Sequence, residues 1–300
     1  MKIFILALCI FLLGTIVMSE TDKFYIPKRN KKEILVIGHR GNAKFSPENT
    51  KKSYETAINL GADIIETDVR ITKDGVLVFQ HDDTIDRNTN GKGPIAEKTF
   101  DELRGYDFGY SDLFGEKFKG ERIFTVEEGI KLFKERKVAY LLEIKTPAVI
   151  EPLSKLIAKL KPAKKYNKFL VWSTNDSQTI IKYMKGYDIY HLAPIDGFIN
   201  TQDKDAYFKD LKSKGITGFS INMGALFGMD KKDTDLFLIL AAKYKMPVGV
   251  WTVDSTAEIN RAMEYQVKGI IKNKTYIGKI DFVTTNDPAK AILLSGKNLK

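Results

Sequence analysis

Residues 34–69 read ILVIGHRGNAKFSPENTKKSYETAINLGADIIETDV and contain the pattern that decides the fold. The runs Ile34–Gly38 and Asp63–Val69 are short, apolar and rich in β-branched residues, as buried strands are. Between them, Glu48–Leu60 carries apolar residues at the spacing of a helix that covers one face of a sheet. Two strands separated by a helix run parallel to each other, so this stretch predicts a βαβ unit.

The same alternation continues to the end of the chain. Six further strands are expected at Val138–Ile144, Phe169–Ser173, Ile189–Leu192, Gly218–Asn222, Val248–Val253 and Asp281–Thr285. The helices between and after them are expected at Val126–Lys134, Val149–Leu160, Ser177–Lys185, Lys204–Lys212, Asp233–Tyr244, Thr256–Tyr265 and Pro288–Leu294. Eight such units in about 260 residues fit an α/β fold of the closed (β/α)8 TIM-barrel type. The alternative, a doubly wound open sheet, normally has a G-x-G-x-x-G turn after its first strand, and the sequence has none.

The N-terminal residues have the composition of a targeting segment. Lys2 precedes the apolar run Ile3–Met18, and polar sequence begins at Ser19, so residues 1–19 are expected to be a signal peptide cleaved before Glu20. An uncleaved membrane anchor formed by residues 3–18 is the alternative. Residues 20–33 form a polar connector, and residues 34–300 are expected to form one barrel domain. These features predict a secreted or periplasmic protein that contacts a membrane only if the leader stays attached.

Residues 83–122 interrupt the strand–helix rhythm between the second and third barrel strands. This stretch contains several glycines and aromatic residues, with a short helical piece at Thr99–Arg104. A long excursion within a compact domain is usually functional, so a lid or binding loop is expected here.

Composition limits the partners. The chain has 48 basic and 38 acidic residues, a net charge of +10, which favours anionic partners such as phosphate groups. The lysines are spread along the sequence, as on a solvated surface, and no basic motif interleaved with aromatic residues is present. Nucleic acid is therefore not expected as a partner. Cys9, the only cysteine, lies in the leader, so a mature chain would have no cysteine nucleophile or metal ligand.

Acidic residues end two of the expected strands. Glu66 and Asp68 end the second strand and Glu143 ends the third, and in a (β/α)8 barrel all strand ends of this kind face one mouth. Side chains at positions i and i+2 of a strand share a face, so Glu66 and Asp68 point the same way. Three converging carboxylates repel one another unless a cation or a proton lies among them. Oxygen ligands suit Ca²⁺ or Mg²⁺, which makes these three residues candidate metal ligands.

Basic and aromatic residues stand at the same strand ends. Arg40 and Lys145 suit a phosphodiester in charge and geometry. His39 and His81 are two of the three histidines, and a histidine on each side of a phosphorus can take up and give back protons. Trp251 is either a core residue at the top of the barrel or a platform for an apolar part of the substrate. His191, at the end of the fifth strand, has no assigned role. Any of these residues taken singly is more often explained by packing, but together they favour a catalytic site.

The chain resembles the glycerophosphodiester phosphodiesterase family in several long motifs. These are His39-Arg40-Gly41, Ser46-Pro47-Glu48-Asn49-Thr50, Glu66-x-Asp68-Val69, Thr72-Lys73-Asp74-Gly75, His81-Asp82, Asp86-Arg87-x-Thr89-Asn90-Gly91-Lys92-Gly93, Glu143-Ile-Lys145 and Val250-Trp251-Thr252-Val253. The segment Phe118–Glu128 also resembles the small insertion of the family. The resemblance covers residues 34 to 287. Part of the second motif has a local explanation, since Ser46 is suited to cap the next helix with Pro47 as its first residue.

The resemblance implies a TIM barrel that hydrolyses glycerophosphodiesters to an alcohol and glycerol 3-phosphate. It implies His39 and His81 as the acid/base pair, Glu66, Asp68 and Glu143 as metal ligands, and Arg40 and Lys145 as phosphate-binding cations. Because no protein nucleophile is evident, we expect the 2-hydroxyl of the substrate to attack phosphorus and form a cyclic phosphate.

Three features depart from the family pattern: the loop Asn42–Phe45, Phe124 in place of a proline, and an extra segment, Lys272–Lys279, before the last strand. The extra segment is expected to alter the rim near Trp251. Two alternatives to the small-substrate enzyme stay open. One is a lysophospholipase D, with Phe108–Phe118 and Met223–Met229 available to hold an acyl chain, and the other is a non-catalytic surface binding protein.

Overall fold

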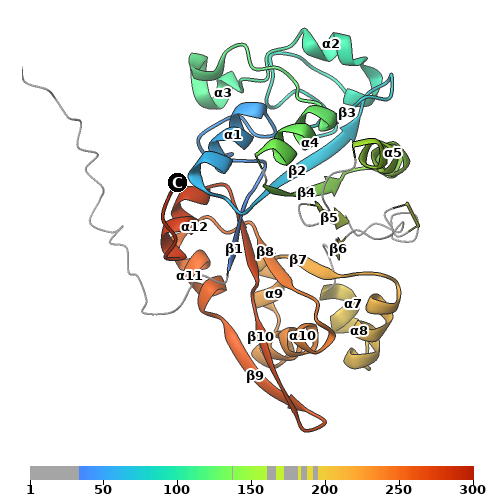
Figure 1. The fold of residues 1–300 in the computed structure, drawn as a ribbon, viewed down its shortest axis with the longest axis vertical. Coiled ribbons are helices and arrows are strands. Elements are labelled where there is room, and N and C mark those ends of the chain that lie inside the picture. The colour runs from blue at the N-terminus through green and yellow to red at the C-terminus, as the bar shows by residue number, and fades with distance from the viewer. Residues whose placement is uncertain (1–33, 137, 161–166, 172–181, 184–187, 192–194) are drawn as a thin grey trace, which may run out of the picture.

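Eight parallel strands form a closed barrel in the computed structural model, which describes residues 34–136, 138–160, 167–171, 182–183, 188–191 and 195–300 (Figure 1). The strands are β1 (Leu35–Gly38), β2 (Ile64–Ile71), β4 (Ala139–Ile144), β5 (Asn167–Val171), β6 (Asp188–His191), β7 (Gly218–Asn222), β8 (Val248–Trp251) and β11 (Phe282–Thr285). Each pairs in parallel with the next in this order, and the ring closes where Leu35 of β1 pairs with Phe282 of β11. The TIM-barrel prediction is confirmed.

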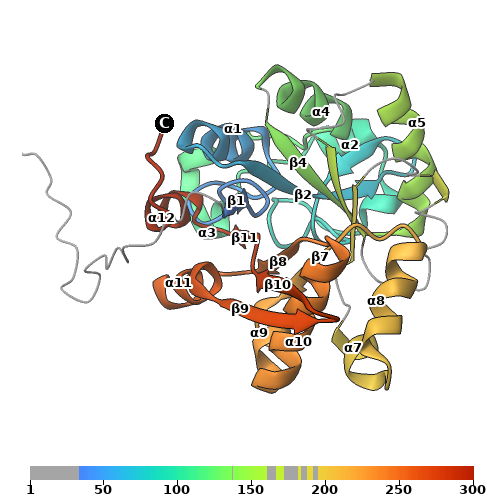
Figure 2. The same ribbon diagram turned by 60° about the horizontal axis from the view of Figure 1, so that its bottom comes forward.

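Helices surround the strands, as Figure 2 shows from a second direction. They are α1 (Lys51–Leu60), α4 (Val126–Glu135), α5 (Ile150–Leu160) preceded by the short helix η5 (Pro147–Val149), α7 (Ile195–Asn200), α8 (Lys204–Ser213), α9 (Met223–Gly228), α10 (Lys231–Tyr244), α11 (Thr256–Glu264) and α12 (Pro288–Leu294). Most bounds lie within three residues of the expected ones. The expected leader, the connector, Ser173 and most of the helix expected at Ser177–Lys185 lie outside the described residues.

The first helix begins later than its sequence suggests. Thr50, and not Ser46, is the N-cap of α1, because its hydroxyl accepts a hydrogen bond from the backbone N–H of Ser53. The hydroxyl of Ser46 instead donates to the carbonyl of Asn42 in the preceding turn. The expectation that Ser46 caps the helix is wrong. Residues 46–49 belong to the loop between β1 and α1.

The barrel has an apolar base and a polar mouth. Val36 points outward into the large core between strands and helices, whereas its neighbour Ile37 points inward, as strand alternation requires. Ile37, Ile64, Leu141 and Phe282 together form a small apolar cluster inside the barrel. Two residues further along β2 and β4, the inward positions are polar. Because side chains at i and i+2 of a strand share a face, Glu66 points inward like Ile64, and Glu143 points inward like Leu141.

The segment between β3 and α4 packs around its own apolar cluster. Strand β3 (Leu77–Phe79) runs antiparallel to the end of β2. The short helices η3 (Ile95–Glu97), α2 (Phe100–Arg104), α3 (Ser111–Phe114) and η4 (Gly115–Phe118) follow it. The cluster consists of Val78, Ile85, Ile95, Leu103, Phe108 and Ile123. Residues 83–122, which we call the insertion, lie over the β2–β3 side of the barrel (Figure 1).

The extra segment near the C-terminus forms an antiparallel hairpin of β9 (Gln266–Ile271) and β10 (Lys274–Lys279). Its Gly269 and Gly278 approach Ile239 and Leu238 of α10 closely enough that a Cβ atom would collide with them. The hairpin leaves the end of α11 and returns to the start of β11, so its ends lie at the amino-terminal side of the barrel. The expectation that it alters the rim near Trp251 is wrong, because this rim is formed by the carboxyl ends of the strands.

No helix among the described residues is long and apolar enough to span a bilayer.

Candidate functional site

The turn between β1 and α1 is shaped to bring His39 and Arg40 to the mouth of the barrel. Arg40 has a φ of 51°, and its backbone N–H donates to Oε2 of Glu66 at 2.9 Å. Gly41 has a φ of 93°, and a Cβ atom there would lie 2.4 Å from Oγ of Ser53. Only glycine fits this left-handed, crowded position, which gives the third residue of the His39-Arg40-Gly41 motif a physical reason.

His39 is held by a residue that follows the neighbouring strand β11, and that residue is oriented by one that follows β8. Its Nδ1 lies 2.7 Å from Oδ1 of Asn286, directly after β11. The side-chain N–H of Asn286 donates to Asp254 at 2.7 Å, which orients the amide so that its oxygen faces the imidazole. His39 therefore donates from Nδ1, and its Nε2 lies 3.9 Å from Glu66. Burial, with a smaller effect of Arg40, lowers the pKa of His39 to about 4, so the ring is neutral near pH 7.

The three carboxylates predicted as metal ligands converge. One oxygen from each of Glu66, Asp68 and Glu143 lies within 4.8 Å of the others. Burial, with added repulsion from Asp68, raises the pKa of Glu66 well above its usual range and that of Glu143 to about 7. Burial acts in the same direction on Asp68, but the charges of Arg40 and Lys145 outweigh it and hold its pKa below the usual range.

Two cations lie against this acidic cluster. Arg40 places Nε 3.2 Å from Oδ2 of Asp68, and Lys145 places Nζ 3.0 Å from Oδ1 of the same carboxylate. Lys145 also contacts Glu143. The guanidinium of Arg40 also contacts Glu48, whose Oε1 accepts from Nη1 at 3.1 Å. Both predicted phosphate-binding cations therefore lie beside the predicted metal ligands, as the sequence suggested.

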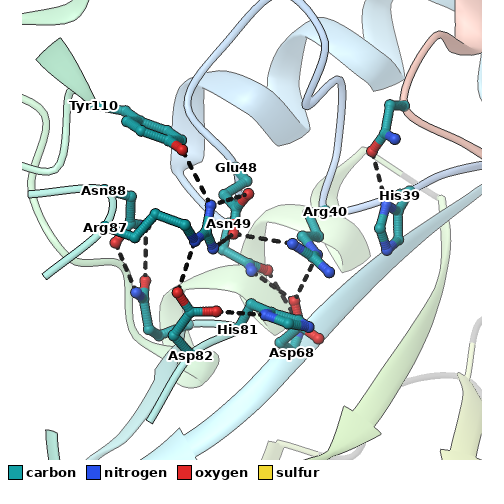
Figure 3. Close-up of polar contacts among 12 residues, drawn as sticks. His39, Arg40, Glu48, Asn49, Asp68, His81, Asp82, Arg87, Asn88 and Tyr110 are labelled. Atoms are coloured by element: carbon teal, nitrogen blue, oxygen red, sulfur yellow. Dashed lines mark hydrogen bonds and ion pairs between the residues drawn. The ribbon is translucent and has the colours of Figure 1, made fainter. Parts of the chain in front are cut away.

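His81 does not follow one of the parallel barrel strands. It follows the antiparallel strand β3. Because β3 runs back antiparallel to β2, the chain after Phe79 returns past Asp68, whose carbonyl accepts from the N–H of Gln80 at 3.1 Å. The guanidinium of Arg70 donates twice to the carbonyl of His81, at 2.9 and 2.6 Å. Nδ1 of His81 lies 2.6 Å from Oδ1 of Asp82 (Figure 3). Burial lowers the pKa of His81, and the charge of Asp68 partly offsets this effect.

Trp251 ends β8 and packs against the apolar cluster inside the barrel. Its side chain is partly exposed, and its buried Nε1 has no hydrogen-bond partner among the described residues. A core position at the top of the barrel, one of its two expected roles, matches this packing. The third histidine, His191, ends β6 as expected, and the described residues assign it no function.

Several residues of the site were not identified from the sequence as site residues. Asn49 donates to Asp68 at 2.7 Å and in turn accepts from the hydroxyl of the buried Tyr54 at 2.9 Å. Asp254 and Asn286 hold His39, as described above. Asp254 and Asn286 each follow a predicted strand, so the rule that polar residues at carboxyl ends of strands face the mouth could have found them. Asn49 lies in a loop and offered no such signal.

The site has the composition of a hard-cation centre that binds phosphate. Oε1 of Glu66 is buried and has no hydrogen-bond partner within the described part of the chain. A buried carboxylate oxygen without a partner is costly, and a divalent cation held among the three carboxylates would satisfy it. The residues present therefore fit a divalent metal ion, with two side-chain cations beside it.

Comparisons with known proteins identify the family. Residues 39–276 match the model of the glycerophosphoryl diester phosphodiesterase family. The chain is 35% identical over 247 residues to the glycerophosphodiester phosphodiesterase of Caldanaerobacter subterraneus, covering 79% of this chain and 93% of that protein. It is 27% identical over 284 residues to the glycerophosphodiester phosphodiesterase of Bacillus subtilis, covering 90% and 94%.

Solved structures show the same fold. A glycerophosphodiester phosphodiesterase from Agrobacterium tumefaciens superposes with a TM-score of 0.68 at 20% identity, covering 87% of this chain and 99% of that one. A phosphodiesterase from Oleispira antarctica, solved in complex with the product sn-glycerol-3-phosphate, gives a TM-score of 0.67 at 21% identity, covering 87% and 96%.

The fold and site thus define a barrel hydrolase of phosphoric diesters. The chain belongs to the glycerophosphodiester phosphodiesterase family. It is an enzyme that hydrolyses glycerophosphodiesters, which excludes the non-catalytic binding protein considered above.

Proposed function

We propose that this enzyme releases an alcohol and glycerol 3-phosphate in a reaction that depends on a divalent metal ion, with His39 and His81 moving the protons. One observation carries the proposal: two histidines approach the same acidic cluster from different elements. His39 comes from the end of β1, 3.9 Å from Glu66, and His81 directly follows Gln80, whose N–H donates to the carbonyl of Asp68 at 3.1 Å. The product of the Oleispira antarctica enzyme supports glycerol 3-phosphate as the phosphate-containing product.

Glu66, Asp68 and Glu143 are the residues that would hold the ion. When bound, Ca²⁺ or Mg²⁺ polarises phosphoryl oxygens and offsets the negative charge that develops on them. Arg40 and Lys145 would bind the phosphodiester beside these carboxylates, since each lies within 3.2 Å of an oxygen of Asp68.

The reaction we propose uses a hydroxyl of the substrate itself. The oxygen of the 2-hydroxyl forms a bond to phosphorus as the bond to the head-group oxygen breaks. One histidine, in its neutral form, accepts the hydroxyl proton, and the other, which must begin as the imidazolium, gives a proton to the departing oxygen. Water then opens the cyclic phosphate and restores both protonation states, so that one water is consumed for each alcohol and glycerol 3-phosphate released. An internal nucleophile avoids much of the entropic cost of bringing in a second reactant.

The test of the mechanism is an analogue of glycerophosphocholine whose 2-hydroxyl is replaced by hydrogen. The proposal expects this analogue to bind but not to release choline. Normal choline release would show that water attacks directly. His39→Ala and His81→Ala should each lower kcat by about 10²–10⁴-fold with the melting temperature retained. Full activity in either variant would remove that histidine from the mechanism.

The lysophospholipase D alternative needs apolar side chains that are free to hold an acyl chain. Phe108 is buried in the apolar cluster of the insertion, and Met223 and Leu226 of α9 are buried in the main core. These three side chains are therefore occupied by packing, whereas Leu113 of α3 is exposed. Substrates without an acyl chain are the ones we propose.

We also propose that residues 1–19 are removed as a signal peptide and that the enzyme acts outside the cytoplasm. The basic Lys2, the apolar run after it and the change to polar residues at Ser19 support the cleavage. Mass spectrometry of the native protein decides between a chain that begins at Glu20 and one that keeps an anchor.

A further inference from the structure

Arg87, in the insertion, lies between two carboxylates of the barrel mouth (Figure 3). Its Nε donates to Oδ2 of Asp82 at 2.6 Å, while Nη1 and Nη2 donate to the two oxygens of Glu48 at 3.0 and 2.6 Å. The hydroxyl of Tyr110 accepts from Nη1 at 3.4 Å, and the ring of Tyr110 lies 5.6 Å from the guanidinium carbon. All three nitrogens of the Arg87 guanidinium therefore donate hydrogen bonds to oxygens of the protein.

These contacts extend into a chain of alternating charges. Glu48 also accepts from Arg40, and Arg40 pairs with Asp68 of the acidic cluster. At the other end, Asp82 pairs with the imidazole of His81. The order Asp68–Arg40–Glu48–Arg87–Asp82–His81 therefore links the acidic cluster to His81 through the insertion.

The contact with Asp82 decides which nitrogen of His81 carries hydrogen. Asp82 accepts through Oδ2 from Arg87 and faces Nδ1 of His81 through Oδ1. Although burial would raise the pKa of Asp82, the hydrogen bonds from Arg87 and His81 hold it at about 2, so this side chain is an acceptor. Nδ1 must then donate, and Nε2 is left free of hydrogen in the neutral ring.

Packing alone does not fix this arrangement. The side chains of His81 and Asp82 are 34% and 26% exposed, so the imidazole can rotate unless polar partners hold it. Glu48, in contrast, is only 10% exposed and lies in the loop just before α1. Arg87 spans the distance between this fixed carboxylate and the more exposed Asp82.

We propose that Arg87 is a positioning residue: by tying Asp82 to Glu48 it keeps the hydrogen of His81 on Nδ1 and presents Nε2 to the substrate. The insertion thereby contributes to catalysis without touching the reacting atoms. This inference rests on the proposed acid/base role of His81.

The first test determines the tautomer of His81 in the full-length protein. The method is ¹⁵N NMR on a sample labelled at histidine. The chain has three histidines, and the His81→Gln variant identifies the signals of His81. At about pH 8, above the ordinary pKa of histidine, wild-type His81 should carry its hydrogen on Nδ1. In Arg87→Met the hydrogen should move mainly to Nε2, the nitrogen that carries it in free histidine in water.

The second test is kinetic, with glycerophosphocholine as the substrate. Arg87→Met should lower kcat by about 10- to 100-fold while KM stays near the wild-type value, as the loss of an outer hydrogen-bond partner does. Arg87→Lys keeps the charge, but one ammonium group cannot bridge both carboxylates. The kcat of Arg87→Lys should therefore lie between those of the wild type and Arg87→Met. Arg104→Met, on the exposed face of α2, is the matched control and should change neither measurement.

Each contrary outcome has a definite meaning. If Arg87→Met keeps the Nδ1 tautomer, the proposal is wrong, whatever happens to kcat. If KM rises while kcat is unchanged, Arg87 binds substrate and does not position His81. Should Arg87→Met fail to fold, the tautomer in Arg87→Lys decides. A fully active His81→Ala variant would instead contradict the catalytic role of His81, and the tautomer result would stand independently of it.

Discussion

Nδ1 of His39 lies 2.7 Å from Oδ1 of Asn286, a residue 247 positions away in the sequence. The two meet because β1 and β11 are neighbours in the closed barrel, where Gly38 pairs with Thr285. Asp254 fixes Asn286 from behind, accepting from its side-chain N–H at 2.7 Å and from its backbone N–H at 2.8 Å. The closure of the barrel thus sets the orientation of a proposed catalytic group.

Replacing Asn286 should therefore damage catalysis more than binding. In Asn286→Leu the imidazole of His39 loses the acceptor for its Nδ1–H, and we expect kcat to fall by about 10- to 100-fold with KM little changed. Steady-state kinetics with glycerophosphocholine, together with a melting curve, measure this effect. Asn273→Asp, at the exposed turn of the β9–β10 hairpin, is the control and should behave as wild type. Equal losses in the two variants would mean that the effect is not specific to His39.

Removal of divalent ions should abolish turnover. Exhaustive chelation leaves Glu66, Asp68 and Glu143 without the cation that their convergence calls for, and activity should return on adding Ca²⁺ or Mg²⁺. Glu66→Gln should raise the metal concentration needed for half-maximal activity, because one charged ligand is lost. Glu97→Gln, exposed on η3 in the insertion, serves as the matched variant and should need no more metal than wild type. Full activity after chelation would rule out the metal.

The affinity for metal should fall as the pH decreases. Burial raises the pKa of Glu143 to about 7 and that of Glu66 well above its usual range, so both bind protons in the metal-free protein near neutral pH. Metal ions require the deprotonated carboxylates, so binding must release protons and weaken below about pH 7. Isothermal titration calorimetry of the metal-free enzyme in buffers of different ionisation enthalpy measures this release. Affinity that is independent of pH between about 8 and 5 would contradict the raised pKa values.

Substrates without an acyl chain should be preferred. Phe108 and Met223, two of the apolar side chains expected to hold an acyl chain, are buried, so we expect a higher kcat/KM for glycerophosphocholine than for lysophosphatidylcholine. A choline-release assay on both substrates, with the lipid kept below its micelle concentration, compares them directly. The reverse order would favour the lysophospholipase D alternative.

The sequence predicted the barrel because its signals are local. Strand and helix periods, and polar residues at strand ends, are visible in short windows such as Asp63–Val69. The i and i+2 rule is enough to put Glu66 beside Asp68, and the strand ends are enough to put Glu143 at the same mouth. The hairpin at Gln266–Lys279 escaped this reasoning, because its alternating residues pack against α10, which a local pattern cannot show.

The sequence by itself therefore determined the parallel strand–helix order, the identity of the acidic cluster and its two flanking histidines, and through its motifs the family. Only the tertiary structure decided what holds the histidines: Asn286 and Asp254 for His39, and Asp82 with Arg87 for His81. The reason is physical. A strand period fixes the direction of neighbouring side chains, but a hydrogen bond depends on the closure of the ring and on the path of the insertion. The closure of the ring brings hydrogen-bonding atoms of His39 and Asn286 within 3 Å of each other, and the path of the insertion does the same for Arg87 and Glu48.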